Sequence, residues 1–258
     1  METGEAARAG KTMVRRRRLA GLMSALAIMT VQPFAAKADP AISARLRAIL
    51  DGLSRQGQDQ IRLIDQALNA SPQLMGQFND AANSGRLTSL ELSSQRPGPF
   101  AATASRGKLL FAPDFISQQR KQRLHDVVRP DDILPDNLVF ALGALIFYAD
   151  APPVPLGSNP QAFVKASTER DAKAFINGWN AMVDAAVKEN RGKALSVQQI
   201  GSLLLNLKYR QVFANQTALG KYKFSPEGKI QPDQQNVEAV AAGLGKLGLL
   251  DIGVAPGP

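Results

Sequence analysis

The chain has 258 residues, a formal net charge of +9 and no cysteine. The absence of cysteine excludes disulfide bonds, thiol catalysis and lipid attachment at a cysteine. Seven of the 31 basic and two of the 22 acidic residues lie within residues 1–38, so the remaining 24 and 20 give only +4. That balance is ordinary for a protein of this size and argues against nucleic-acid binding.

Residues 1–38 contain the basic region, the apolar region and the cleavage site of a secretory signal peptide, in the required order. Four arginines (15–18) precede an uncharged stretch over 19–31, and Ala36-Lys-Ala38 precedes Asp39. The uncharged stretch is too short to span a bilayer, which takes about 20 residues. We expect export by general secretion rather than the twin-arginine route, to a bacterial periplasm or the medium, with Met13 as an alternative start. The exported part, 39–258, is not expected to be embedded in a membrane.

Residues 39–258 predict a single, mostly helical secreted domain with a small β-element, that is, a mainly α (α+β) fold. Apolar spacing predicts helices over 42–68, 73–82, 114–128, 134–149, 167–190 and from Asp233 or Asn236 to about 250. One more helix starts at Ser196, which forms a capping box with Gln199. Short β-tolerant runs predict a hairpin-like sheet formed by 87–92 and 107–111 and a second hairpin over 221–230. The proline-rich composition of 151–160 predicts a loop.

Residues able to perform catalysis are scarce. The one histidine, His125, lies on a basic helix, and no Gly-x-Ser-x-Gly motif accompanies it. Zinc sites take several His or Cys ligands, so no metal is expected. The Gly-x-Gly-x-x-Gly spacing of a dinucleotide-binding loop occurs at Gly243-Leu-Gly-Lys-Leu-Gly248, but this run follows no predicted strand. We therefore predict no catalytic residue and no cofactor.

Two segments are candidates for recognition. Arg120, Lys121 and Arg123 offer a positive helix surface for phosphate or an anionic cell-envelope polymer. The loop over 151–160 is the other candidate, because loops on rigid scaffolds often carry binding residues. The partner is either a protein or a cell-envelope ligand, and the sequence does not give an oligomeric state.

The order of elements over 85–190 resembles the core of the zincin-like metallopeptidases, above all the Glu-zincins. A strand-like Gly107–Pro113 leads to a helix, then to a very apolar helix ending in 142–149, and later to a helix containing Glu169. In that family an edge strand runs past the active-site helix, which carries His-Glu-x-x-His, and a later helix supplies a Glu as the third zinc ligand. The resemblance places the first His at Ala144, the catalytic Glu at Leu145, the second His at Tyr148 and the third ligand at Glu169.

Three of these four positions lack the residue that the chemistry needs, so the resemblance implies a pseudopeptidase without zinc or a general base. The sequence thus favours an exported, non-catalytic helical protein with a binding role. The alternative is a cell-envelope hydrolase that uses carboxylates such as Glu169 and Asp171.

Overall fold

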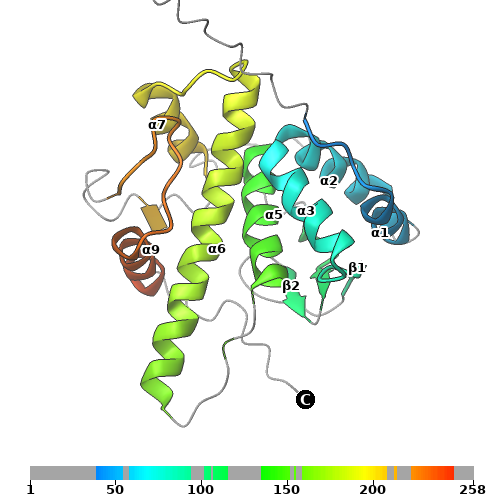
Figure 1. Cartoon of the computed structure of the whole chain (residues 1–258), viewed down its shortest axis with the longest axis horizontal. Coiled ribbons are helices and arrows are strands. Elements are labelled where there is room, and N and C mark those ends of the chain that lie inside the picture. Colours follow the sequence, from blue (N-terminus) through cyan, green and yellow to red (C-terminus); the bar gives the residue numbers. More distant parts are fainter. Residues whose placement is uncertain are drawn as a thin grey trace, which may run out of the picture. The chain divides into compact units, whose positions relative to one another are not determined.

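The structure is a computed structural model. It describes residues 39–54, 58–93, 102–105, 107–115, 135–151, 154, 159–207, 212–213 and 222–246. The chain divides into two units, 1–38 and 39–258, and every described residue belongs to the second. This unit is mainly helical with one small sheet, as the sequence predicts (Figure 1).

Three helices open the described chain: α1 (Ala44–Ser54), α2 (Gln58–Ala70) and α3 (Pro72–Asn83). The prediction of one helix over 42–68 is therefore wrong, because α1 ends shortly after Gly52, a residue type that weakens a helix. α3 matches its prediction closely. It begins where the Ser71 hydroxyl accepts a hydrogen bond from the Leu74 amide and proline occupies the first helical position.

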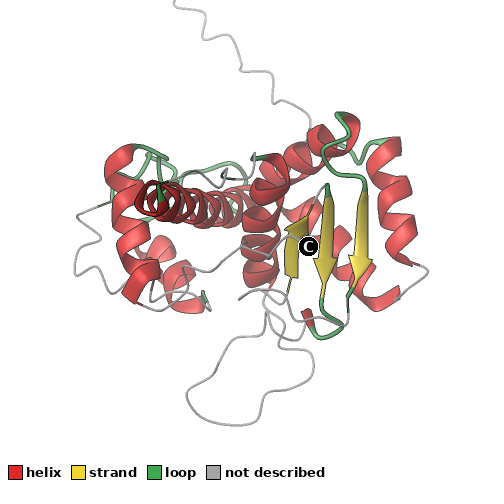
Figure 2. Ribbon diagram, turned by 90° about the horizontal axis from the view of Figure 1, so that it is seen from below, coloured by secondary structure: helices red, strands yellow, loops and turns green. Residues whose placement is uncertain are grey.

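The sheet has three strands, β1 (Ser89–Leu92), β2 (Ala102–Ser105) and β3 (Lys108–Phe111), in the order β1-β3-β2 (Figure 2). β1 pairs with β3 in parallel and β2 pairs with β3 antiparallel. The predicted hairpin of 87–92 with 107–111 is wrong, since parallel strands need a crossover rather than a tight turn. The resemblance also implies an edge position for 107–113, whereas β3 is the central strand.

α5 (Pro135–Asp150) and α6 (Pro160–Glu189) form the most extensive contact between any two described elements. They are antiparallel, because Tyr148 meets Asp171 while Gly143 meets Gly178. α5 agrees with its prediction, whereas α6 starts seven residues earlier than expected. The Asn159 side chain accepts hydrogen bonds from the amides of residues 161 and 162, and Pro160 fits the first turn.

Two glycines allow α5 and α6 to approach each other closely. A Cβ atom on Gly178 would lie 2.5 Å from the Phe140 carbonyl oxygen, and one on Gly143 would lie 2.9 Å from the Gly178 Cα. Real Cβ atoms do not come so close to backbone atoms, so only glycine fits at both positions without moving a helix.

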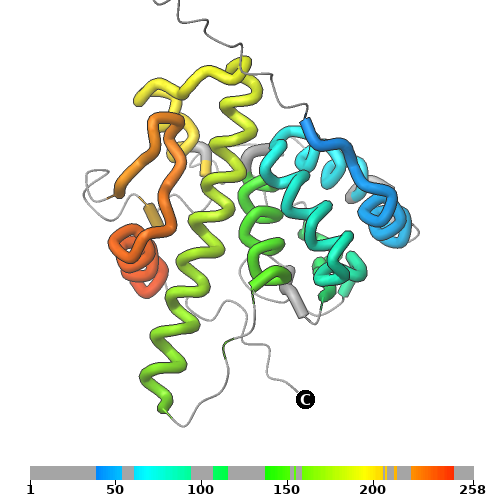
Figure 3. The backbone as a smooth tube through the Cα atoms, in the orientation of Figure 1, coloured from blue at the N-terminus to red at the C-terminus, as the bar shows by residue number. Residues whose placement is uncertain are grey.

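The chain continues through α7 (Val197–Asn206) and α9 (Gln234–Lys246). α9 packs against α6, and the tube view shows these two helices side by side (Figure 3). The capping box at the start of α7 is confirmed, and the predicted second hairpin is reduced to one antiparallel bridge between Phe224 and Ile230. Asp233 caps α9, as one of the two predicted starts requires, through a hydrogen bond from the Asn236 amide.

An aromatic cluster links these C-terminal elements to the α5–α6 pair. Trp179 packs on Phe213 with ring centroids 5.5 Å apart, and Phe140 packs edge-on against Phe175 at the same distance. The Trp179 indole also donates a hydrogen bond to the Gly228 carbonyl oxygen. Within the described ranges, no helix combines the length and the apolar character needed to cross a membrane.

Candidate functional site

The four positions singled out by the resemblance lie on α5 and α6. Ala144 and Leu145 on α5 are fully or almost fully buried, with 0% and 1% of their surface exposed. Tyr148, one turn further along α5, is 7% exposed. Glu169 lies on α6 and is half-buried. Three of the four side chains are thus part of the packed core.

Tyr148 makes a specific polar contact with α6. Its hydroxyl donates a hydrogen bond of 2.9 Å to Oδ1 of Asp171, which is itself only 2% exposed. A buried carboxylate is costly unless it is hydrogen-bonded. The pair therefore satisfies two polar groups at once inside the contact between α5 and α6.

Arg170 contacts the C-terminal end of α5 beside Tyr148. Its guanidinium donates to the carbonyl oxygens of Tyr148, at 3.1 Å, and Ala151, at 3.3 Å. It also lies 5.1 Å from the centroid of the Tyr148 ring. Arg170 thereby satisfies carbonyl groups at the C-terminal end of α5, where its positive charge interacts favourably with the helix dipole. Its position over the Tyr148 ring adds a cation–π contact.

The surroundings of Tyr148 hold its hydroxyl in the neutral form. Burial raises the pKa of Tyr148 well above its ordinary value, and the nearby Asp171 raises it further by its charge and its hydrogen bond. A neutral hydroxyl donates one hydrogen bond, and here that bond goes to Asp171. The group is thus arranged to stabilise the helix pair rather than to titrate near neutral pH.

No metal-binding group is present among the residues that the structure describes: no three His, Asp or Glu side chains lie close enough to share an ion. The side chain of Glu169, the expected third ligand, makes neither a hydrogen bond nor an ion pair with any described residue. Sequence reasoning identified Tyr148 and Asp171 separately, but it did not predict that they meet.

Other candidates from the sequence fall elsewhere. Arg120, Lys121, Arg123 and His125 lie outside the described residues, and so does most of the loop over 151–160. The glycine-rich run 243–248 begins late in α9 rather than after a strand, which a dinucleotide loop requires, and its last two residues lie outside the described residues.

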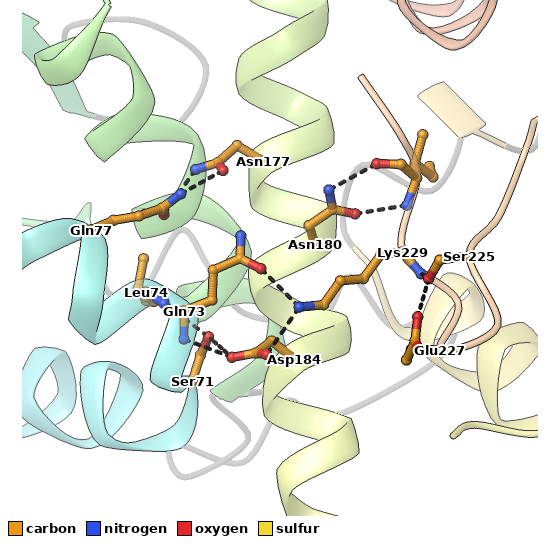
Figure 4. Close-up of polar contacts among 11 residues, drawn as sticks. Ser71, Gln73, Leu74, Gln77, Asn177, Asn180, Asp184, Ser225, Glu227 and Lys229 are labelled. Atoms are coloured by element: carbon orange, nitrogen blue, oxygen red, sulfur yellow. Dashed lines mark hydrogen bonds and ion pairs between the residues drawn. The ribbon is translucent and has the colours of Figure 1, made fainter. Parts of the chain in front are cut away.

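Sequence reasoning missed a second polar feature, a stripe along α6 formed by Asn177, Asn180, Asp184 and Lys188 and called here the α6 polar stripe. Figure 4 shows the first three of these residues with their partners. Asn177 exchanges hydrogen bonds with Gln77 of α3 and donates to the Gly143 carbonyl oxygen at 2.7 Å. Asn180 pairs with both backbone groups of Ile230.

Asp184 is the centre of this stripe. Its Oδ2 accepts from the Ser71 hydroxyl at 2.9 Å and from the Gln73 amide at 2.8 Å, while its Oδ1 accepts from Nζ of Lys229 at 3.1 Å. Lys229 also donates to the Gln73 side chain. The carboxylate therefore caps the N-terminus of α3 and ties the 225–230 turn to α6 (Figure 4).

The role of the α6 polar stripe is to hold other elements of the fold against α6. Its side chains bond to side chains and backbone groups of other elements, and Ser71, the hydroxyl partner of Asp184, is fully buried. The spacing of i, i+3, i+7 and i+11 could have revealed one polar helix face. It could not have revealed the partners of that face, which lie between 34 and 119 residues away along the chain for the hydrogen bonds of these side chains.

Comparisons with protein-family models, with curated proteins and with solved structures gave no match for this chain.

Proposed function

We propose that this chain is an exported, non-catalytic helical protein that acts by binding, and that its fold is a zincin-like core from which the zinc site has been lost. The observation that carries the proposal is the hydrogen bond from the buried Tyr148 hydroxyl to Asp171. It joins α5 to α6 at the level of the position that would hold the second zinc-ligating histidine.

The geometry around Tyr148 supports a degenerate site. In metal sites, a histidine ligand commonly donates its second N–H to a carboxylate that orients the ring. Asp171 stands in such a relation to position 148, and Glu169 lies two residues earlier on the same helix. A tyrosine hydroxyl at 148 uses the carboxylate without offering a ligand to zinc.

The other two positions support the loss of catalysis. The side chains of Ala144 and Leu145 carry no ligand atom and no group able to deprotonate a water, and both are in the core. The hydrolase alternative is less well supported, because Asp171 is buried and engaged by Tyr148 rather than open to a substrate.

Export is part of the same proposal. Asp39 is the first residue after the Ala36-x-Ala38 pattern. Its Oδ2 forms an ion pair with Nζ of Lys188 at 2.6 Å, and the same Nζ donates a hydrogen bond to the Asn69 carbonyl oxygen. Expression of the full chain in a bacterium should give a periplasmic or secreted product whose first residue is Asp39. Retention of the intact N-terminus in the cytoplasm would refute this part.

The absence of catalysis is tested with the purified chain on casein and on peptidoglycan. We expect no hydrolysis of either. Turnover that disappears in Glu169→Gln or Asp171→Asn, without a fall in melting temperature, would replace the proposal by the carboxylate hydrolase.

A further inference from the structure

The contact between α5 and α6 contains a chemically labile dipeptide. In Asn177-Gly178 an asparagine is followed directly by a glycine, and this pair occurs nowhere else in the sequence. An asparagine side chain can react with the backbone nitrogen of the next residue, and glycine hinders that reaction least because it has no side chain and a freely rotating backbone. Among the asparagines of the chain, Asn177 therefore has the sequence context that most favours loss of its side-chain amide.

Packing requires both members of this pair, each for its own reason. Gly178 is required because a Cβ atom there would lie 2.5 Å from the Phe140 carbonyl oxygen of α5. Asn177 donates from Nδ2 to the Gly143 carbonyl oxygen at 2.7 Å, and it exchanges two hydrogen bonds with the Gln77 side chain, at 2.8 and 3.1 Å (Figure 4). The close approach of the helices thus places the labile pair where α5 and α6 meet.

The folded chain keeps the reacting atoms apart. The reaction joins the backbone nitrogen of Gly178 to Cγ of Asn177. Both residues lie in the interior of α6, so the N–H of Gly178 is engaged by the carbonyl oxygen of Ala174 one turn earlier. Ring closure also needs a rotation about the Cα–C bond of Asn177, which the helical ψ of about −42° does not allow. The three hydrogen bonds of the Asn177 side chain fix Cγ as well.

We propose that Asn177-Gly178 is a deamidation site that the packed α5–α6 contact keeps closed and that becomes reactive when this contact unfolds. In the unfolded chain the backbone nitrogen of Gly178 loses its proton to solvent and forms a bond to Cγ of Asn177. The side-chain amide nitrogen takes up a proton and leaves as ammonia. Water then opens the cyclic imide to an aspartate or an isoaspartate, so the whole reaction consumes one water and releases one ammonia.

The product does not fit the folded structure. A carboxylate at position 177 has no N–H, so it cannot donate to the carbonyl oxygen of Gly143 or to Gln77, and its negative charge faces that carbonyl oxygen instead. An isoaspartate also lengthens the main chain of α6 by one carbon atom beside Gly178, where the helices are closest. A chemical step thereby makes unfolding irreversible. This inference does not depend on the proposed binding role.

The first experiment compares deamidation with unfolding in one series of samples. The purified chain is held at mildly alkaline pH over a range of urea concentrations, digested with pepsin at low pH, and analysed by mass spectrometry for loss of the amide at Asn177. The rate should follow the unfolded fraction, from none measurable in the folded chain to a plateau above the transition. Asn180, on the same helix but followed by alanine, should react much more slowly throughout. A rate at Asn177 that stays constant across the transition, or that equals the rate at Asn180 in urea, would overturn the inference.

Two tyrosine variants test whether the α5–α6 contact controls the reaction. Tyr148→Phe removes the hydrogen bond to Asp171 that joins the two helices, so it should shift both the unfolding curve and the deamidation curve of Asn177 to lower urea by the same amount. Tyr222→Phe, the matched control, should not shift either curve to lower urea. A shift of the unfolding curve by Tyr148→Phe without a shift of the deamidation curve would contradict the proposed protection.

The irreversibility is tested by refolding. Wild-type samples held in urea for increasing times are diluted, and the fraction that regains the original urea midpoint should fall in step with the loss of the Asn177 amide. Asn177→Gln, whose longer side chain closes such a ring far more slowly, should keep a constant refolding yield. Asn177→Asp, which does not depend on folding of the glutamine variant, should have a lower urea midpoint than the wild type. Deamidated wild type, or Asn177→Asp, with an unchanged midpoint would refute the inference.

Discussion

The Tyr148 hydroxyl on α5 donates a 2.9 Å hydrogen bond to the buried carboxylate of Asp171 on α6. Both residues are more than nine-tenths buried, and Arg170 closes the contact from outside by binding the Tyr148 carbonyl oxygen. Removal of either partner would leave a buried polar group without its bond, so the pair contributes to the joining of the two longest helices described.

Tyr148→Phe should lower the free energy of unfolding by about 1–3 kcal/mol, because it removes the bond to Asp171 and leaves the carboxylate less satisfied. Tyr222→Phe is the matched control. Tyr222 is also buried, but its hydroxyl has no hydrogen-bond partner in the described chain, so its removal should leave stability unchanged or raise it. Urea unfolding of both variants measures the difference, and equal destabilisation would contradict the account.

Stability should fall at high pH because two buried tyrosines resist ionisation. Burial raises the pKa of Tyr222 to about 12, so between pH 10 and pH 12 the unfolded chain loses a proton that the folded chain keeps. The unfolded state then binds fewer protons, and the free energy of unfolding decreases as the pH rises.

The contribution of Tyr222 is isolated by comparison with Tyr222→Phe. Urea unfolding at intervals from pH 9 upward should show that the wild type loses more stability than the variant once the pH exceeds the tyrosine pKa of an unfolded chain, about 10. Lysine deprotonation affects both proteins alike. Parallel curves for the two proteins would contradict the burial of a neutral Tyr222 hydroxyl.

Gly178→Ala should destabilise the chain by about 1–3 kcal/mol, since the new methyl would lie 2.5 Å from the Phe140 carbonyl oxygen and push α5 away from α6. Gly201→Ala, in a helix with open space around the Cβ position, should instead stabilise by up to about 1 kcal/mol. Thermal unfolding distinguishes the two. A harmless Gly178→Ala would show that the helices are not so close.

Asp184→Asn should cost about 1.5–3 kcal/mol, because the carboxylate caps α3 and accepts charge-assisted bonds from Ser71 and Lys229. The double-mutant cycle with Lys229→Met isolates the ion pair, for which we expect a coupling of about 1 kcal/mol. Additive effects of the two changes would show that Lys229 and Asp184 do not interact in solution.

Local signals predicted much of the fold. Ser196 and Gln199 specify the start of α7 because both partners of the capping box lie within four residues, and the uninterrupted apolar run of α5 identifies a buried helix. The sequence predicts a later start for α6, because the four prolines within 151–160 favour a loop over that whole segment. Asn159-Pro160 is in fact a cap followed by a first-turn proline.

Contacts between distant segments could not be predicted in the same way. The parallel pairing of β1 with β3 depends on the path of the chain between them, and β2 is too small and too alanine-rich to stand out. The partners of Asp184 come from positions 71, 73 and 229. The sequence marks such polar residues as candidates for catalysis or for a solvated face, and only the packing shows that they join elements.

The most direct test of the lost zinc site is the zinc content of the purified chain beside that of Ala144→His/Leu145→Glu/Tyr148→His, after dialysis against zinc and with folding checked by circular dichroism. The account predicts no zinc in the wild type and about one per chain in the variant, held with Glu169 as third ligand. Ala144→His/Tyr148→His serves as a milder variant if the first does not fold. Stoichiometric zinc in the wild type, or a folded histidine variant that takes up none, would contradict the account.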